Sequence, residues 1–299
     1  MTLDISGSRT LGVLGDVGPL AFGHWRFVGH DVADATRLLE TALEAGMTLV
    51  DTADVYGLDW GGTAFGQAEE LLGEVLAANP RLRDEIVLAT KGGILPPVPY
   101  DSSPGRLRTA LDDSLRRLQT DRIDLYQIHR PDMYTHPADV AATLDGFIDS
   151  GKVRAVGVSN HTPAQTDALV AHLRHPLTTI QPQYSVAHLD PQRDGTFDLA
   201  MRIGATPLAW SPLGGGGIVT GEGIRTDLGV VLDRIAGREG VDRAAVALAF
   251  VLAHPSRPIA IVGSQNPERL RSSVDALGVE LSRQDVYDLV QASEGRPLP

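Results

Sequence analysis

Short apolar runs alternate along this chain with segments whose apolar residues recur at helical spacing. Runs typical of buried strands lie at residues 19–23, 48–51, 86–91, 123–129, 153–159, 179–183, 206–210 and 259–262. Segments with the helical pattern follow them at residues 32–45, 67–78, 104–118, 137–149, 163–173, 198–203, 227–238, 243–254, 267–276 and 283–292. The pattern therefore predicts eight strands, each followed by at least one helix.

This alternation predicts an α/β fold, because strands separated by helices pair in parallel. Eight such units close into a (β/α)8 TIM barrel, and a chain of 299 residues can form one as a single domain. We expect a cap over residues 1–18 and C-terminal helices over residues 267–292. An open doubly wound sheet is the alternative, but no Gly-x-Gly-x-x-Gly motif follows the first strand.

Composition narrows the range of partners. The formal net charge is −12, without a block of five like charges, which argues against nucleic acid and anionic membranes. The chain has no cysteine, so disulfides and thiolate metal sites are excluded. The N-terminus has no signal-peptide pattern, and the longest apolar run, 244–253, is too short to span a bilayer. We expect a cytoplasmic protein, monomeric because nothing in the pattern requires a partner.

Three predicted strands end on ionisable residues, Asp51, Lys91 and His129, and Tyr56 follows the first of them. In a parallel barrel these ends meet on the face where barrel enzymes place their chemistry. Taken singly, the aspartate could be a helix cap and the other two ordinary loop residues. Their coincidence on one face favours a functional site.

These four side chains can together polarise a carbonyl and give it a proton. A free phenol has a pKa of about 10, which is high for proton transfer at neutral pH. We expect the ammonium of Lys91 to lower the pKa of Tyr56, Asp51 to keep Lys91 charged, and His129 to bind a carbonyl oxygen. A metallohydrolase barrel would need His-x-His after the first strand, where this chain has only His24, so no metal is expected.

The motifs Asp51-Thr52-Ala53-x-x-Tyr56-Gly57 and Thr90-Lys91, together with His129, resemble the catalytic tetrad of the aldo-keto reductase superfamily. The resemblance extends over residues 10–292 and includes the segments 151–160, 181–185, 210–214 and 262–269. The run His-Arg-Pro-Asp at 129–132 is most similar to a bacterial branch of that superfamily.

The resemblance implies a barrel that reduces aldehydes or ketones to alcohols with NADPH, with Tyr56 as general acid. NADPH is expected in preference to NADH. It implies that Asp51 and Lys91 support Tyr56, and that His129 orients the carbonyl. The implied cofactor-binding residues are Asp51, Ser159, Asn160, Gln181, Trp210, Ser211, Leu213, Gly214, Gly263, Ser264 and Arg269.

Two parts of this cofactor site also have a physical basis. Ser159 and Asn160 end a strand, although they could equally cap the next helix. Gly263 and Ser264 precede a predicted helix, whose N-terminus would suit an anion. Arg269 could bind a 2′-phosphate or be an ordinary solvated residue.

The substrate pocket is expected to include Trp25, Tyr56, Trp60, His129 and Tyr134, an apolar wall suited to carbonyl compounds with a hydrophobic or aromatic body. The alternative is that these aromatic rings only cover the barrel. A different function on the same barrel is a cofactor-binding redox sensor or regulatory subunit, against which the complete tetrad argues. A barrel hydrolase or isomerase is a further alternative.

Overall fold

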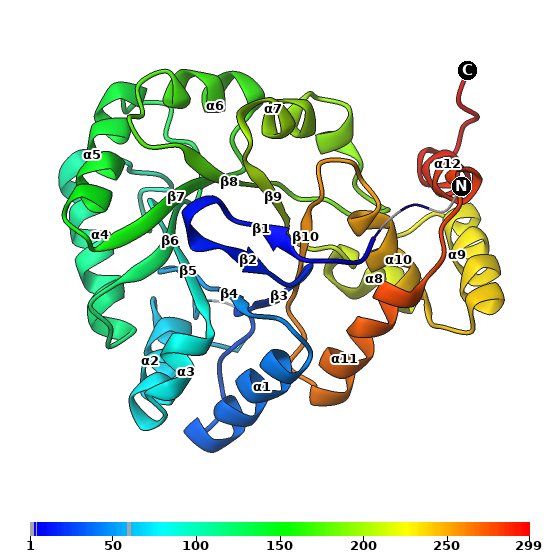
Figure 1. Ribbon diagram of the computed structural model, residues 1–299, viewed down its shortest axis with the longest axis horizontal. Coiled ribbons are helices and arrows are strands. Elements are labelled where there is room, and N and C mark those ends of the chain that lie inside the picture. Colours follow the sequence, from blue (N-terminus) through cyan, green and yellow to red (C-terminus); the bar gives the residue numbers. More distant parts are fainter. Residues whose placement is uncertain (1–2, 4, 59–60) are drawn as a thin grey trace.

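Eight parallel strands form a closed barrel in the order β10-β3-β4-β5-β6-β7-β8-β9, with helices around it (Figure 1). The computed structural model describes residues 3, 5–58 and 61–299. The barrel strands are β3 (Leu20–Gly23), β4 (Leu49–Asp51), β5 (Val87–Gly92), β6 (Ile123–Ile128), β7 (Val153–Ser159), β8 (Leu177–Gln181), β9 (Thr206–Ala209) and β10 (Ile259–Val262). The predicted TIM barrel is confirmed.

The helices lie outside the barrel, and several begin at side-chain caps. Thr162 and Ser282 each form a capping box with the residue three positions later. The helices are α1 (Val32–Glu44), α2 (Gln67–Ala78), α3 (Arg81–Glu85), α4 (Pro104–Arg117), α5 (Pro137–Asp149), α6 (Pro163–Val170), α7 (Thr196–Ile203), α8 (Gly217–Thr220), α9 (Thr226–Glu239), α10 (Arg243–Leu252), α11 (Pro267–Ser272) and α12 (Arg283–Glu294).

Several predicted boundaries were wrong by two or more residues. Strand β8 begins and ends two residues before the predicted 179–183, because Pro182 has no N–H with which to continue the ladder. Helix α6 ends at Val170, where the chain turns toward Pro176. Helix α11 ends at Ser272 and is followed directly by the 3-10 helix Ser273–Gly278, whereas the pattern predicted a single helix over residues 267–276. The short helices α3 and α8 were not predicted.

A hairpin of β1 (Arg9–Thr10) and β2 (Asp16–Val17) lies across the amino-terminal end of the barrel (Figure 1). Thr206, the first residue of β9, donates a hydrogen bond to the carbonyl oxygen of Thr10 at 2.8 Å. The hairpin packs its apolar side chains against the barrel interior, in a cluster of Leu11, Leu14, Val17, Ala21, Leu49, Ala89, Leu125, Ala155, Leu208, Ile259 and Ile261. The barrel is therefore a packed core that is closed at this end.

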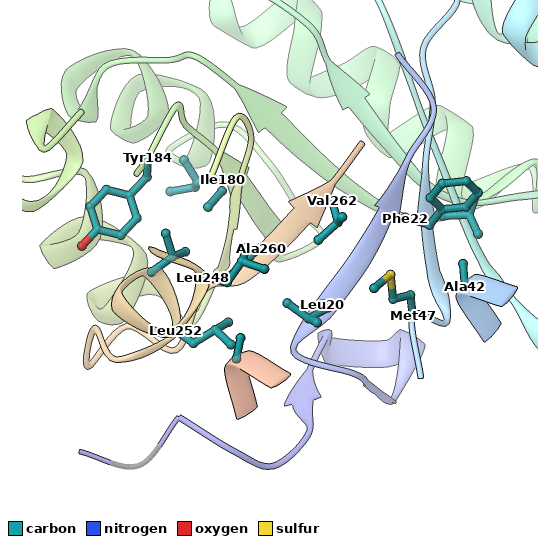
Figure 2. Packing of buried hydrophobic residues seen from close by; sticks show 14 of the residues in the cluster. Leu20, Phe22, Ala42, Met47, Ile180, Tyr184, Leu248, Leu252, Ala260 and Val262 are labelled. Carbon is teal, nitrogen blue, oxygen red and sulfur yellow. The ribbon is translucent and has the colours of Figure 1, made fainter. Parts of the chain in front are cut away.

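A larger apolar core lies between the barrel and its helices. Because successive strand residues point to opposite faces, Leu20 and Phe22 contact the helix layer while Ala21 faces inward. Figure 2 shows Leu20 near Ala260 of β10, and Phe22 near Ala42 of α1 and Met47. This packing fixes the strands whose carboxyl ends carry the candidate site. No helix in the described part of the chain has the length and apolar character needed to cross a membrane.

Candidate active site

The four residues of the predicted tetrad lie together at the carboxyl ends of β4, β5 and β6. The Nζ atom of Lys91 is 2.7 Å from Oδ2 of Asp51 and 3.1 Å from the hydroxyl oxygen of Tyr56. The rings of Tyr56 and His129 meet edge to face, with their centroids 5.8 Å apart. Asp51 is thus an ion-pair partner of a fully buried lysine, and its alternative as a helix cap is ruled out.

Backbone contacts hold Tyr56 over Lys91. The ammonium of Lys91 also donates to the carbonyl oxygen of Thr52 at 2.8 Å, and the amide of Asp54 donates to the carbonyl oxygen of Lys91 at 3.0 Å. Gly57 has φ of 119°, and a Cβ atom there would lie 2.4 Å from the carbonyl oxygen of Ala64. The turn that presents the phenol therefore requires glycine after it.

Two glutamines hold the far side of Asp51. Gln181 and Gln127 donate from Nε2 to Oδ1 of Asp51 at 2.9 and 3.3 Å. Thr179 in turn donates to Oε1 of Gln127 at 3.1 Å, and a Cβ atom on Gly157 would lie only 2.0 Å from the Thr179 hydroxyl. Our sequence analysis missed Gln127, Thr179 and Gly157; the available signal was polar residues and a glycine inside otherwise apolar strands.

The structure corrects the expected protonation of Tyr56. Burial raises the pKa of Tyr56, and although the Lys91 ammonium lowers it, the net pKa is above that of a free phenol. Burial alone would lower the pKa of Lys91. The charge of Asp51 and the contact with Tyr56 outweigh the effect of burial, so the pKa of Lys91 is raised. Tyr56 therefore holds its proton at neutral pH beside a charged lysine.

Two histidines near Lys91 are neutral. Burial, with the charges of Lys91 and Arg130, places the pKa of His129 well below its ordinary value. Burial and Lys91 also lower the pKa of His24 to about 3. The ring of His24 stacks on Phe27, with centroids 4.0 Å apart, and neither of its nitrogens has a hydrogen-bond partner in the described part of the chain. His129 can thus donate a hydrogen bond without carrying charge.

One cavity of about 540 Å³ is lined by Asp51, Tyr56 and His129 of the tetrad and also by Arg269, whereas the buried Lys91 does not line it. Gly215 and Gly216 line it in place of the expected Gly214. Tyr134 is 96% exposed and is not brought to the cavity, because its amide is held by Asp132 in an outward turn. Trp60 lies outside the described residues. The remaining expected residues line the cavity: Trp25, Asp51, Tyr56, His129, Ser159, Asn160, Gln181, Trp210, Ser211, Leu213, Gly263, Ser264 and Arg269.

A chain of hydrogen bonds joins the loops after β7, β8 and β9. The indole of Trp210 donates to Oδ1 of Asn160 at 2.9 Å, and Nδ2 of Asn160 donates to the Ser159 hydroxyl at 2.8 Å. Ser159 donates to the carbonyl oxygen of Gln181 at 2.9 Å. Asn160 has φ of 57°, a left-handed conformation that asparagine tolerates better than most residues. These contacts present an aromatic ring and amide groups to one wall of the cavity.

At the far end of the cavity, side chains and not helix amides are the groups open to an anion. The Asn266 side chain already accepts hydrogen bonds from the amides of Glu268 and Arg269, so the N-terminal amides of α11 are occupied. The expectation of a helix N-terminal anion site is corrected accordingly. Ser264 and Arg269 line the cavity, and their hydroxyl and guanidinium groups suit a phosphate.

The fold and the cluster of Asp51, Tyr56, Lys91 and His129 fit a barrel enzyme that acts on carbonyl groups, and comparison with known proteins agrees with this class. The family model for the aldo/keto reductase family matches residues 19–294, and the chain belongs to this family of oxidoreductases. It is 49% identical to the 6-dehydroglucose reductase of Novosphingobium aromaticivorans over 286 residues, covering 95% of this chain and 94% of that protein. It is 36% identical to the 6-dehydroglucose reductase of Agrobacterium fabrum, covering 95% and 96%.

A solved structure has the same architecture. The thermostable aldo-keto reductase Tm1743 superposes with a TM-score of 0.82 at 26% identity, covering 96% of this chain and 99% of that one.

Proposed function

We propose that this protein is an NADPH-dependent reductase that converts aldehydes or ketones to alcohols, with Tyr56 as the general acid. The observation that carries the proposal is the 3.1 Å contact between the Tyr56 hydroxyl and the Lys91 ammonium. Tyr56 lines the same cavity as His129 and Arg269. A sensor or regulatory subunit that only binds the cofactor would not need a protonated phenol beside a buried ammonium.

The cavity-lining residues would hold the cofactor along its length. The ring of Trp210 would stack on the nicotinamide, and the amides of Asn160 and Gln181 would bind its carboxamide. Ser264 and Arg269 would bind the 2′-phosphate, which supports NADPH over NADH. Bound NADPH supplies a hydride to the carbonyl carbon.

The residues of the chain supply and stabilise the proton. Tyr56 donates its proton to the carbonyl oxygen, and the charge of Lys91 stabilises the phenolate that remains. Asp51 keeps Lys91 charged and in place. Neutral His129 donates a hydrogen bond to the oxygen as negative charge develops on it.

The substrate is proposed to be 6-dehydroglucose or a closely similar hydroxylated aldehyde. Two relatives at 49% and 36% identity, each matched over nearly the full length of both chains, are 6-dehydroglucose reductases. The pocket includes Arg130 as well as apolar Ile94 and Leu58, so its wall is more polar than our sequence analysis expected.

The test is titration of the purified protein with NADPH and NADH, followed by tryptophan fluorescence, and then an assay of aldehyde reduction. Tyr56→Phe should reduce kcat by at least about 100-fold and leave the Kd of NADPH within about twofold. Tyr287→Phe, at an exposed tyrosine of α12, is the matched control. Undiminished turnover in Tyr56→Phe would refute the acid role, and failure to bind either cofactor would refute the reductase.

A further inference from the structure

Arg130 is a cationic side chain at the reactive end of the cavity that the proposed mechanism does not use. It follows His129 directly, is half-buried, and lines the same cavity as Tyr56. Its guanidinium carbon lies 5.8 Å from the centre of the Trp210 ring. Its charge also acts on both Tyr56 and His129, the two groups proposed to contact the carbonyl oxygen.

Arg130 has no carboxylate partner in the part of the chain that the structure describes. Other partly buried arginines do: Arg117 pairs with Glu69 at 2.7 Å, and Arg83 pairs with Asp124 at 2.8 Å. The contact with Trp210 offsets some of the charge of Arg130 but uses none of its five N–H donors. A half-buried guanidinium with unused donors in a cavity is a site for oxygen atoms of a ligand.

The position of Arg130 indicates which oxygen atoms these are. Tyr56 and His129 are proposed to fix the carbonyl oxygen, and consecutive residues have Cα atoms only about 3.8 Å apart. Arg130 and His129 also line one cavity, so the guanidinium is placed to reach a substituent on the carbon next to the carbonyl. The 2′-phosphate of a cofactor would lie at the other end of the cavity, where Arg269 provides the charge.

We propose that Arg130 is a specificity-determining residue that binds an oxygen substituent on the carbon adjacent to the substrate carbonyl and so selects hydroxylated aldehydes. This inference rests on the proposed function and deepens it. A hydroxyl and a carboxylate at that carbon share the required chemistry. The hydroxyl is the one present in a sugar aldehyde.

The experiment compares kcat/KM for three small aldehydes with NADPH. D-Glyceraldehyde and propanal have the same carbon chain and differ in their hydroxyl groups, and glyoxylate has a carboxylate at the adjacent carbon. The variants are Arg130→Met, which keeps an unbranched apolar stem, and Arg130→Lys, which keeps the charge. Arg116→Leu, at an exposed arginine on α4, is the matched control.

Arg130→Met should lower kcat/KM for glyceraldehyde by about 10- to 100-fold, mainly through KM, and change that for propanal by less than about threefold. Arg130→Lys should give an intermediate loss, because an ammonium lacks the forked donor geometry. Arg116→Leu should match the wild-type protein on both aldehydes.

Other results would overturn the inference. Equal losses on glyceraldehyde and propanal would make Arg130 a general structural residue, and a loss confined to glyoxylate would make the site specific for anions. Weaker NADPH binding in Arg130→Met, with unchanged preference between aldehydes, would assign Arg130 to the cofactor. A wild-type protein that reduces none of the three with NADPH would contradict the proposed function itself, and the inference would fall with it.

Discussion

Gln127 donates a hydrogen bond to Asp51 at 3.3 Å, from the second strand along in the barrel. Gln181 donates to the same carboxylate oxygen, so that the other oxygen faces Lys91. Gln127 is fully buried and does not line the cavity, whereas Gln181 does. The orientation of the catalytic ion pair therefore depends in part on a residue that no ligand can reach.

Gln127→Leu should lower kcat by about 10-fold and leave the Kd of NADPH unchanged. The change removes one donor to Asp51 and leaves the Thr179 hydroxyl without its acceptor, at a cost of about 1–3 kcal/mol. Gln181→Leu should lower kcat and also weaken cofactor binding, because its amide is proposed to contact the carboxamide. Steady-state kinetics and fluorescence titration separate the two. Weakened NADPH binding in Gln127→Leu would contradict this division.

Arg269→Ala should weaken NADPH binding by about 10- to 100-fold, because a charge-assisted hydrogen bond contributes about 1.5–3 kcal/mol. The Kd of NADH, which lacks the 2′-phosphate, should stay within about twofold of the wild-type value. Arg271→Ala is a matched control on the same helix, at a residue that does not line the cavity. Equal weakening of both cofactors by Arg269→Ala would exclude the 2′-phosphate role.

His24→Phe should remove part of the acid sensitivity of the fold. The pKa of His24 is lowered to about 3 in the folded protein, so below pH 6.5 the unfolded chain binds a proton that the folded chain does not. Stability from this residue is therefore full above pH 6.5 and falls as the pH falls toward 3.

Lowering the pH from 7 to 5 should reduce the free energy of unfolding of the wild-type protein by about 2 kcal/mol through His24. The phenylalanine variant should not show this loss. Urea unfolding at the two pH values measures the difference. Near pH 7 the variant should be about as stable as the wild type, because the imidazole nitrogens have no partners to lose. The same pH dependence in both proteins would show that His24 is not buried as described.

Gly157→Ala should destabilise the protein by about 1–3 kcal/mol, the usual cost of overpacking a core. The new methyl group would displace the Thr179 hydroxyl and with it the support of Gln127, so kcat should fall as well. Gly146→Ala is the same substitution in the interior of α5, where a Cβ atom meets nothing within 4 Å. It should stabilise the protein by about 0.5–1 kcal/mol. A loss of stability from Gly146→Ala comparable to that from Gly157→Ala would reject the steric explanation.

The order of strands and helices could be predicted from sequence because each element carries its own periodic pattern. Boundaries were less predictable where backbone chemistry intervenes. Pro182 ends β8 two residues before the end of the predicted strand, and Ser273 begins a 3-10 turn that has the same spacing as the helix before it. Neither feature changes the pattern of apolar positions.

The sequence predicts the site residues that stand at the ends of strands. Asp51, Lys91 and His129 were found in this way, and the structure brings them together. Gln127 and Thr179 were missed because their role depends on a contact between strands made possible by Gly157. The direction of the Tyr56 pKa shift depends on how deeply the phenol is buried, and that depth is not encoded in any local motif.

The hairpin over the amino-terminal end of the barrel leaves only the opposite face open to ligands. Because that end is closed, both reactants must use the opposite face, where Tyr56 and Arg269 share one cavity. A cofactor placed along this cavity, as proposed, forms one wall of the space that the carbonyl compound occupies. On the proposed function, binding would then be ordered: NADPH would bind before the aldehyde, and the alcohol would leave before NADP+.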